Sequence, residues 1–265
     1  MNTQTRDNAM QMLNKVPEVT LYFWIIKIMA TTVGETAADF LNVNMHFGLS
    51  GTSVVMAVIL AAFLTMQFRA RKYVPWLYWV VVVLVSVVGT LITDNLIDTF
   101  GVPLETTTIA FGIALLATFA AWFASERTLS IHSVFTTRRE IFYWAAILFT
   151  FALGTAAGDL AAEGLQFGYA TSGLIFAGLI GLVTLAHYGL KANAVLCFWI
   201  AYILTRPLGA SFGDYLSQAV PDGGLGLGTI VTSAIFLATI ASLVLYLSVT
   251  RKDVLPSPNR SRISA

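Results

Sequence analysis

The stretch FWIIKIMATTVGETAAD, residues 23–39, decides how this chain folds, because its outline returns three more times. Each copy has an aromatic pair ending in tryptophan, a glycine ten residues later, and an aspartate five residues after the glycine. The four copies are Phe23-Trp24…Gly34…Asp39, Tyr78-Trp79…Gly89…Asp94, Tyr143-Trp144…Gly154…Asp159 and Phe198-Trp199…Gly209…Asp214. Each copy lies within a long apolar stretch. The chain is therefore predicted to be a tandem array of membrane-embedded units, each carrying an ionisable group where such groups are costly.

The composition supports a membrane protein. Of 265 residues, 57% are hydrophobic and 11% are charged, and the mean hydropathy is +0.77, whereas soluble domains carry about 25% charged residues. An apolar helix of roughly 20 residues crosses a membrane. Eight such windows are predicted, near residues 17–41, 46–68, 75–97, 104–124, 140–163, 166–188, 193–217 and 225–249.

The domain organisation follows from these windows. We expect a first half at residues 17–124 and a second half at residues 140–250, joined by a cytoplasmic linker at residues 125–139. Cytoplasmic tails are expected at residues 1–16 and 251–265. The segments outside the windows are too short for a soluble catalytic or nucleic-acid-binding domain.

The basic residues predict the topology. With the N-terminus in the cytoplasm, 13 of the 15 Lys and Arg residues fall on the cytoplasmic side, and none falls on the other side. By the positive-inside rule both termini are therefore expected in the cytoplasm. The remaining two, Lys27 and Arg206, lie inside predicted helices. The cytoplasmic residues are Arg6, Lys15, Arg69, Arg71, Lys72, Arg127, Arg138, Arg139, Lys191, Arg251, Lys252, Arg260 and Arg262.

Two further features limit the function classes. Residues 1–16 show no apolar core with a cleavage site, so we expect no cleaved secretory signal. Cys197 is the only cysteine in the chain, which excludes an internal disulfide. No nucleotide-binding or hydrolase motif is present. We therefore predict that the protein is not an enzyme and that it has no cofactor other than a bound divalent cation.

The spacing of the copies predicts their arrangement. The glycines stand at 34, 89, 154 and 209, so the first pair maps onto the second by a constant shift of 120 residues. Each unit has two spans, so successive units insert with the same orientation as parallel repeats. The predicted fold is an all-α integral membrane protein with eight transmembrane helices, arranged as a pseudo-symmetric bundle of four two-helix repeats.

These motifs resemble a bacterial multi-pass membrane family that is catalogued as a repeat of unknown function and is marked by a tryptophan in each repeat. The resemblance covers roughly residues 20 to 250. It implies eight helices and a multi-pass protein of the bacterial inner (cytoplasmic) membrane. It implies no particular activity.

Helical periodicity predicts which side chains share a face. Positions four apart lie on one face, and stepping back from each aspartate gives four stripes. They are Lys27–Thr31–Glu35–Asp39, Val82–Ser86–Thr90–Asp94, Ile147–Phe151–Thr155–Asp159 and Tyr202–Arg206–Ala210–Asp214. Lipid cannot satisfy polar groups, so these faces should point into the bundle.

Other residues of the repeats have predicted structural roles. The glycines are expected to mark close helix contacts on another face, and the tryptophans to act as interfacial anchors on the cytoplasmic side. Pro207 removes a backbone donor, which predicts an irregularity in the seventh span.

The charges inside the bundle indicate cation or proton handling. Lys27 and Arg206 oppose five carboxylates, and an interior with such an excess needs protons or a cation. We predict a cation or proton site formed by Asp39, Asp94, Asp159, Asp214 and Glu35, with the hydroxyls Thr31, Ser86, Thr90 and Thr155. The same five carboxylates are the predicted metal ligands. Lys27 and Arg206 are predicted counter-charges.

The sequence thus favours a transporter of a small cation. Carboxylate and hydroxyl oxygens suit hard divalent ions such as Mn²⁺, and protons are a second substrate. The expected partners are membrane lipid and the cation, with no nucleic acid and with the oligomeric state left open. Two alternatives remain: a scaffold or accessory subunit whose aspartates only fix helix packing, and a carrier of a small organic solute.

Overall fold

The computed structural model describes residues 14–44 and 48–254, and these residues contain helices and no strands. The predicted tails therefore lie mostly outside the described residues, as do Arg6, Arg260 and Arg262. The long helices are α2 (Leu21–Asn44), α3 (Gly48–Arg69), α4 (Pro75–Asp94), α5 (Leu104–Glu126), α6 (Thr137–Asp159), α7 (Tyr169–Leu190), α8 (Ala194–Ser217) and α9 (Thr229–Thr250). This confirms the predicted all-α fold of eight helices.

Within the described residues, seven of these helices are long and apolar enough to cross a membrane. The exception is α2, which is as long as the others at 24 residues but contains Lys27, Glu35 and Asp39. Its charged side chains point into the protein, as described below. The protein is therefore a multi-pass membrane protein.

The helices form an inner and an outer layer. The first helices of the repeats, α2, α4, α6 and α8, each pack against two others of this set and so close a ring. In the most apolar part of α4, α6 and α8, 61%, 61% and 50% of residues are buried, against 6–22% in α3, α5, α7 and α9. The apolar side chains on the outer helices are exposed to the surroundings, as expected of a surface that faces lipid.

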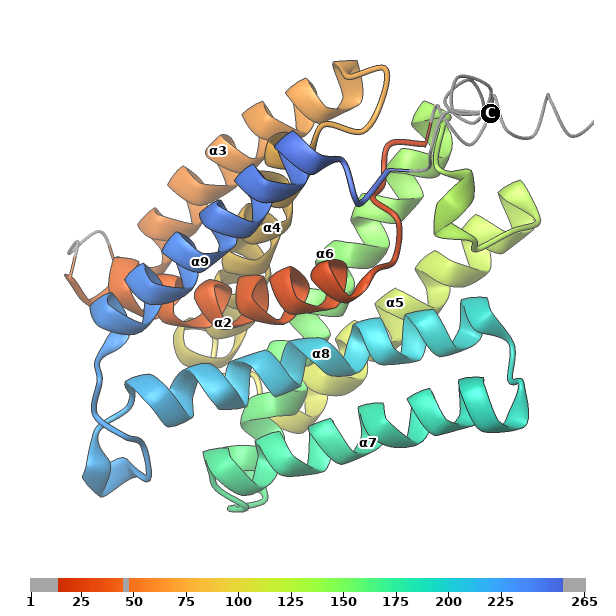
Figure 1. Cartoon of the computed structure of the whole chain (residues 1–265). Helices are drawn as coiled ribbons and strands as arrows, with labels where there is room; N and C mark the ends of the chain where they lie inside the picture. Colours follow the sequence, from red (N-terminus) through yellow and green to blue (C-terminus); the bar gives the residue numbers. More distant parts are fainter. Residues whose placement is uncertain (1–13, 45–47, 255–265) are drawn as a thin grey trace, which may run out of the picture.

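The outer helix of each repeat packs on the inner helix of the next repeat. α3 lies against α4, α5 against α6, and α7 against α8, while α9 returns to α2. Figure 1 shows α9 crossing α2 at an angle, and the two helices pack together although they stand at opposite ends of the sequence. Both predicted halves therefore contribute to one closed ring.

The repeat glycines hold the ring together, as predicted. Each glycine faces the next inner helix so closely that a Cβ there would overlap its neighbour, which is the role of small residues between membrane helices. The neighbour is always the residue eight positions before the next repeat's aspartate. The contacts are Gly34 with Ser86, Gly89 with Phe151, Gly154 with Arg206, and Gly209 with Thr31.

The prediction that the tryptophans are interfacial anchors is wrong for three of the four. Trp79, Trp144 and Trp199 are only 2%, 5% and 4% exposed, because the interior of the ring must be filled at this level. The first aromatic residue of each repeat packs on the tryptophan of the next. The ring centroids are 5.6 Å apart for Phe23–Trp79, 5.5 Å for Tyr78–Trp144, 6.3 Å for Tyr143–Trp199 and 5.7 Å for Phe198–Trp24.

The segment before α2 crosses the end of the ring that contains these aromatic residues. Lys15 Nζ donates to Glu140 Oε2 at 2.6 Å and to the Phe68 carbonyl at 3.0 Å, and the Glu18 amide donates to the Asp253 carbonyl. The hydrogen bond between His132 and the Glu18 carboxylate raises the pKa of His132, against the opposite effect of partial burial. This end of the ring is thus closed by an aromatic layer and by a strap of backbone.

The predicted irregularity at Pro207 is absent, since α8 continues through this residue as one helix. Irregular turns occur instead in the second and third repeats. There α4 and α6 end in π-helical turns, at Asn95–Thr99 and Leu160–Gly164. Such turns are frequent at functional sites, and here each one directly follows a repeat aspartate.

Candidate cation site

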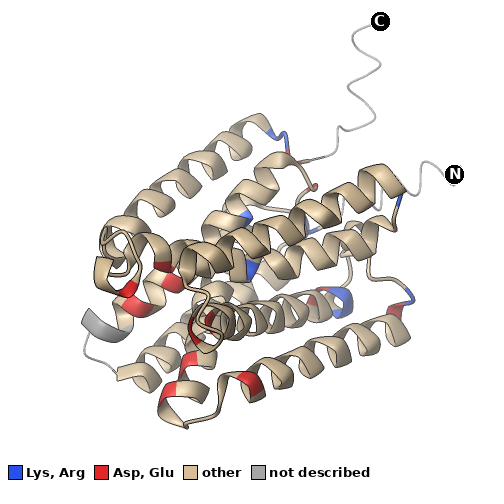
Figure 2. Ribbon diagram, turned by 90° about the horizontal axis from the view of Figure 1, so that it is seen from below, with Lys and Arg blue, Asp and Glu red and all other residues tan. Residues whose placement is uncertain are grey.

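The charged residues are distributed unevenly along the bundle. Figure 2 shows Lys and Arg gathered at one end and most Asp and Glu towards the other. At the acidic end a cavity of about 180 Å³ opens between the inner helices. All four repeat aspartates line it, with Glu35 and three further polar residues. Its complete lining is Glu35, Asp39, Asp94, Ile97, Asp98, Leu104, Asp159, Glu163, Asp214 and Gln218.

The repeats place the aspartates at this depth because each one lies near the end of an inner helix. Asp94 and Asp159 are the last residues of α4 and α6, and Asp214 is three residues before the end of α8. Because the four inner helices form a ring, their ends, and with them the four aspartates, lie around one cavity. The predicted convergence of the repeat aspartates is therefore present in the structure.

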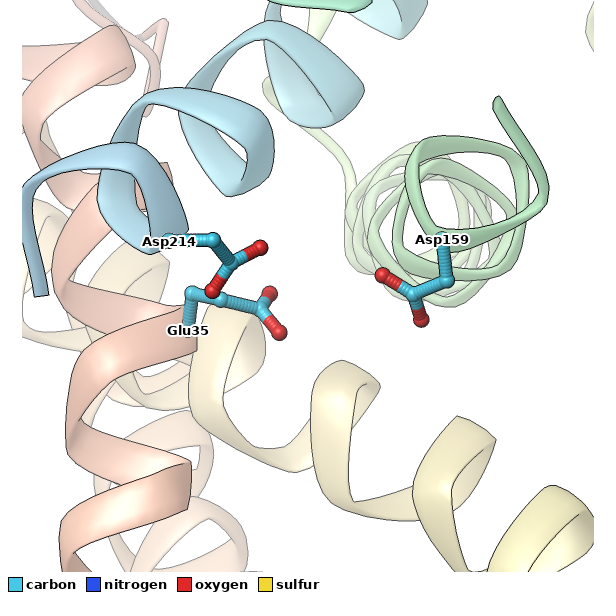
Figure 3. A group of neighbouring side chains, drawn as sticks. All are labelled: Glu35, Asp159 and Asp214. Atoms are coloured by element: carbon cyan, nitrogen blue, oxygen red, sulfur yellow. The ribbon is translucent and has the colours of Figure 1, made fainter. Parts of the chain in front are cut away.

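Three of the carboxylates come especially close. Glu35, Asp159 and Asp214, from α2, α6 and α8, each offer an oxygen atom, and these atoms all lie within 4.8 Å of one another. Figure 3 shows Glu35 and Asp214 side by side, with Asp159 pointing towards them from α6. Asp39 and Asp94 line the same cavity but do not belong to this group of three, which we call the carboxylate triad.

The electrostatics of the cavity favour a positive ligand. Two ionised carboxylates within 4.8 Å of each other repel by at least about 3 kcal/mol at an effective dielectric constant of 20. Only one basic side chain is within ion-pair distance of a lining carboxylate among the described residues, and that is Arg206 at Glu35. The excess of negative charge must be balanced by protons or by a bound cation.

Arg206 forms the inner boundary of the site. Its side chain is fully buried, and Nη2 donates to Glu35 Oε2 at 2.8 Å and to Thr155 Oγ1 at 2.7 Å. The same nitrogen donates to Thr90 Oγ1, and Nη1 donates to the Thr31 carbonyl at 3.3 Å. Arg206 belongs to α8, so this one guanidinium group ties all four inner helices together. Arg206, a predicted counter-charge, is thus paired with a carboxylate of another repeat.

Lys27 lies deeper, towards the basic end. It is fully buried, and its Nζ donates to Thr205 Oγ1 at 3.3 Å. The ammonium group stands 4.3 Å from the ring centroid of Phe151 and 4.2 Å from that of Tyr202, distances typical of cation–π contacts. No described carboxylate forms an ion pair with it.

The comparison with known families agrees with the repeat structure. A family described as "Repeat of Unknown Function (DUF347)" matches four times, at residues 22–73, 77–128, 142–193 and 197–253. The chain belongs to this family. The four matches are the four two-helix repeats seen in the fold. The same comparisons returned no match among curated proteins or solved structures.

The predicted hydroxyl ligands of this family member lie outside the cavity. Thr90 and Thr155 bond to Arg206, one helical turn deeper than the aspartates. Thr31 donates to the Ile28 and Thr205 carbonyls, and Ser86 packs against Gly34. The structure therefore places the hydroxyls of Thr90 and Thr155 at the guanidinium group of Arg206, and none of the four hydroxyls lines the cavity.

Two carboxylates of the cavity were missed among the predicted site residues. Asp98 and Glu163 each stand four residues after a repeat aspartate, so they continue the stripes by which the site was predicted. The predicted stripes end at Asp94 and Asp159 and therefore do not include these two positions. Gln218, the third missed polar residue, stands four residues after Asp214 and obeys the same spacing.

A larger hollow of about 460 Å³ lies near the basic end, between α2, α7 and α8. Its lining is mostly apolar and includes His132 and His187 but none of the carboxylates. Size alone therefore does not identify the site. The smaller cavity is the better candidate because side chains of one charge converge on it from every inner helix.

Proposed function

We propose that this protein transports a small cation across the bacterial inner membrane, with a hard divalent ion such as Mn²⁺, protons, or both as the substrate. The observation that carries the proposal is the acidic cavity. Every repeat delivers its aspartate to this cavity, and most of the resulting negative charge has no basic partner within the described residues. A structural role would be served better by paired charges, because unpaired buried charges destabilise a fold.

The donor set suits hard ions. The cavity offers carboxylate oxygens and one amide, with no cysteine or histidine, and Mn²⁺, Mg²⁺ and Ca²⁺ prefer such ligands. The carboxylate triad is close enough for one ion to contact all three side chains after small rotamer changes. The same carboxylates would accept protons when no metal ion is bound, which links the two proposed substrates.

The charge distribution supports one orientation. If the end rich in Lys and Arg faces the cytoplasm, the acidic cavity opens to the opposite side and both termini are cytoplasmic. A cation would then enter the cavity from outside the cell. The aromatic layer and the strap at the cytoplasmic end would have to move before the ion could leave, as expected for alternating access.

The size of the cavity argues against an organic solute. At about 180 Å³ it is smaller than the roughly 300–1,000 Å³ of ordinary small-molecule sites. The scaffold alternative makes a different prediction. If the aspartates only fixed helix packing, neutral variants would alter stability without affecting any ion flux.

Flux measurements test the proposal. Purified protein is reconstituted into liposomes that contain a Mn²⁺-sensitive dye, and uptake is followed for wild type, Asp159→Asn and Glu105→Gln. Glu105 is an exposed acid at the start of α5 that does not line the cavity, so it controls for the loss of one negative charge. We expect uptake by wild type and Glu105→Gln and little uptake by Asp159→Asn. If wild-type liposomes take up Mn²⁺ no faster than empty ones, with and without a pH gradient, the proposal of manganese transport is wrong.

A further inference from the structure

We propose that Arg206 is a tethered competitor of the transported cation: both bind Glu35, and the ion can enter the inner part of the site only by taking Glu35 from Arg206. This inference rests on the proposed function and adds to it the step that controls access to the deeper part of the ring. It concerns one side chain of the fourth repeat.

Glu35 has two sets of neighbours. Its Oε2 accepts from Arg206 Nη2 at 2.8 Å, and the same carboxylate belongs to the triad with Asp159 and Asp214. A carboxylate shared in this way cannot give its full negative charge to both a guanidinium group and a metal ion. Binding of the ion therefore weakens the ion pair, and by reciprocity the ion pair weakens binding of the ion.

Arg206 has other hydrogen-bond acceptors besides Glu35. Besides Glu35, the guanidinium group has three neutral acceptors, which are the hydroxyls of Thr90 and Thr155 and the carbonyl of Thr31. These acceptors hold the group in place when Glu35 turns away. Arg206 Nε has no acceptor, so the group has spare capacity for a changed set of bonds.

The ring offers only one such group. The positions equivalent to Arg206 in the other repeats are Thr31, Ser86 and Phe151, as their contacts with the repeat glycines show. The arginine of the fourth repeat therefore places a guanidinium group between the cavity and the aromatic layer, and Lys27 adds a second buried basic group behind it.

The experiment compares two substitutions that each remove one buried basic side chain. Arg206→Met removes the competitor at Glu35, whereas Lys27→Met removes a basic group that bonds to no described carboxylate. Mn²⁺ affinity is measured by isothermal titration on purified protein in detergent at neutral pH. We expect Arg206→Met to bind Mn²⁺ about tenfold more tightly than wild type or better, and Lys27→Met to change affinity by about threefold or less.

Two results would overturn the inference. One is an Arg206→Met affinity equal to or weaker than that of wild type. The other is an equal gain in both variants, since this would show a general effect of charge rather than competition for Glu35. If Arg206→Met does not yield a folded protein, Arg206→Gln replaces it, because its amide can still donate to the threonine hydroxyls, and the same limits apply.

The proposed function can fail separately. If wild type does not bind Mn²⁺ at all, the manganese site is refuted and the competition falls with it. If wild type and Glu105→Gln bind Mn²⁺ while the Arg206 variants show no gain, only the competition is refuted. Where wild type binds Mn²⁺, Glu35→Gln is expected to lose that binding, which assigns the measured binding to the carboxylate triad.

Discussion

Neutralising Glu35 should destabilise the protein more than neutralising Asp214, although both belong to the carboxylate triad. Glu35→Gln leaves the fully buried Arg206 without its only ion-pair partner among the described residues. Removing one member of a buried pair typically costs about 3–5 kcal/mol. Arg206 keeps three neutral acceptors, and the new amide can still accept, so we expect a cost near 3 kcal/mol.

A second effect acts in the opposite direction. Loss of the Glu35 charge also relieves repulsion within the triad, by at least about 3 kcal/mol for each ionised neighbour within 4.8 Å. Asp214→Asn gives a similar relief, and Asp214 forms no ion pair in the described residues. The difference between these two variants therefore isolates the pair with Arg206.

Thermal unfolding in detergent provides the assay. It can be followed by tryptophan fluorescence, because Trp79, Trp144 and Trp199 are buried. A difference of about 3 kcal/mol corresponds to a Tm lower by roughly 6–12 °C for Glu35→Gln than for Asp214→Asn. The double variant Glu35→Gln/Arg206→Gln should recover most of this loss, since no charge is then left unpaired. Equal Tm values for the two single variants, or additive losses in the double variant, would refute the reasoning.

Three further predictions concern the ring, the basic end and the orientation. Gly154→Leu should prevent recovery of folded protein in size-exclusion chromatography, because its side chain would overlap the next inner helix, whereas Gly178→Leu should be tolerated since nothing lies within 4 Å of that position. The stabilisation that His132 gains from its acidic partner should be complete below its ordinary pKa of about 6.5 and lost as the pH rises through its raised folded pKa. The Tm difference between wild type and His132→Gln should therefore be larger at about pH 5.5 than at about pH 8.5, and an unchanged or reversed difference would contradict this. In a Cys197-free background, a cysteine at Pro103 should react with an impermeant thiol reagent in intact cells and one at Lys191 should not; the reverse pattern would invert the orientation.

Much of the fold was predictable because the repeat can be recognised from the spacing of a few residues in the sequence. The glycine and aspartate of each copy stand at fixed spacing, and helical geometry places them on different faces. This spacing is enough to predict an inner stripe of polar residues and a separate line of helix contact. Both are present, with Gly89 against α6 and Asp94 in the cavity as one example.

Other features depend on how the repeats pack, which spacing alone does not determine. A tryptophan at the start of a membrane helix suits either an interface or a filled interior, and only the closed ring buries Trp144. The hydroxyls of Thr90 and Thr155 share a stripe with the aspartates, yet both accept hydrogen bonds from Arg206 and neither lines the cavity. The π-helical turns after Asp94 and Asp159 likewise have no signature in the apolar pattern.

The position of a bound ion tests the central claim most directly. Crystals of the protein grown with Mn²⁺, with diffraction measured at the manganese absorption edge, would locate the ion by its anomalous scattering. The account predicts one strong peak between Glu35, Asp159 and Asp214, and its loss in crystals of Asp159→Asn grown in the same way. A peak elsewhere, such as beside His132 and His187 in the apolar hollow, with none among these carboxylates, would contradict it.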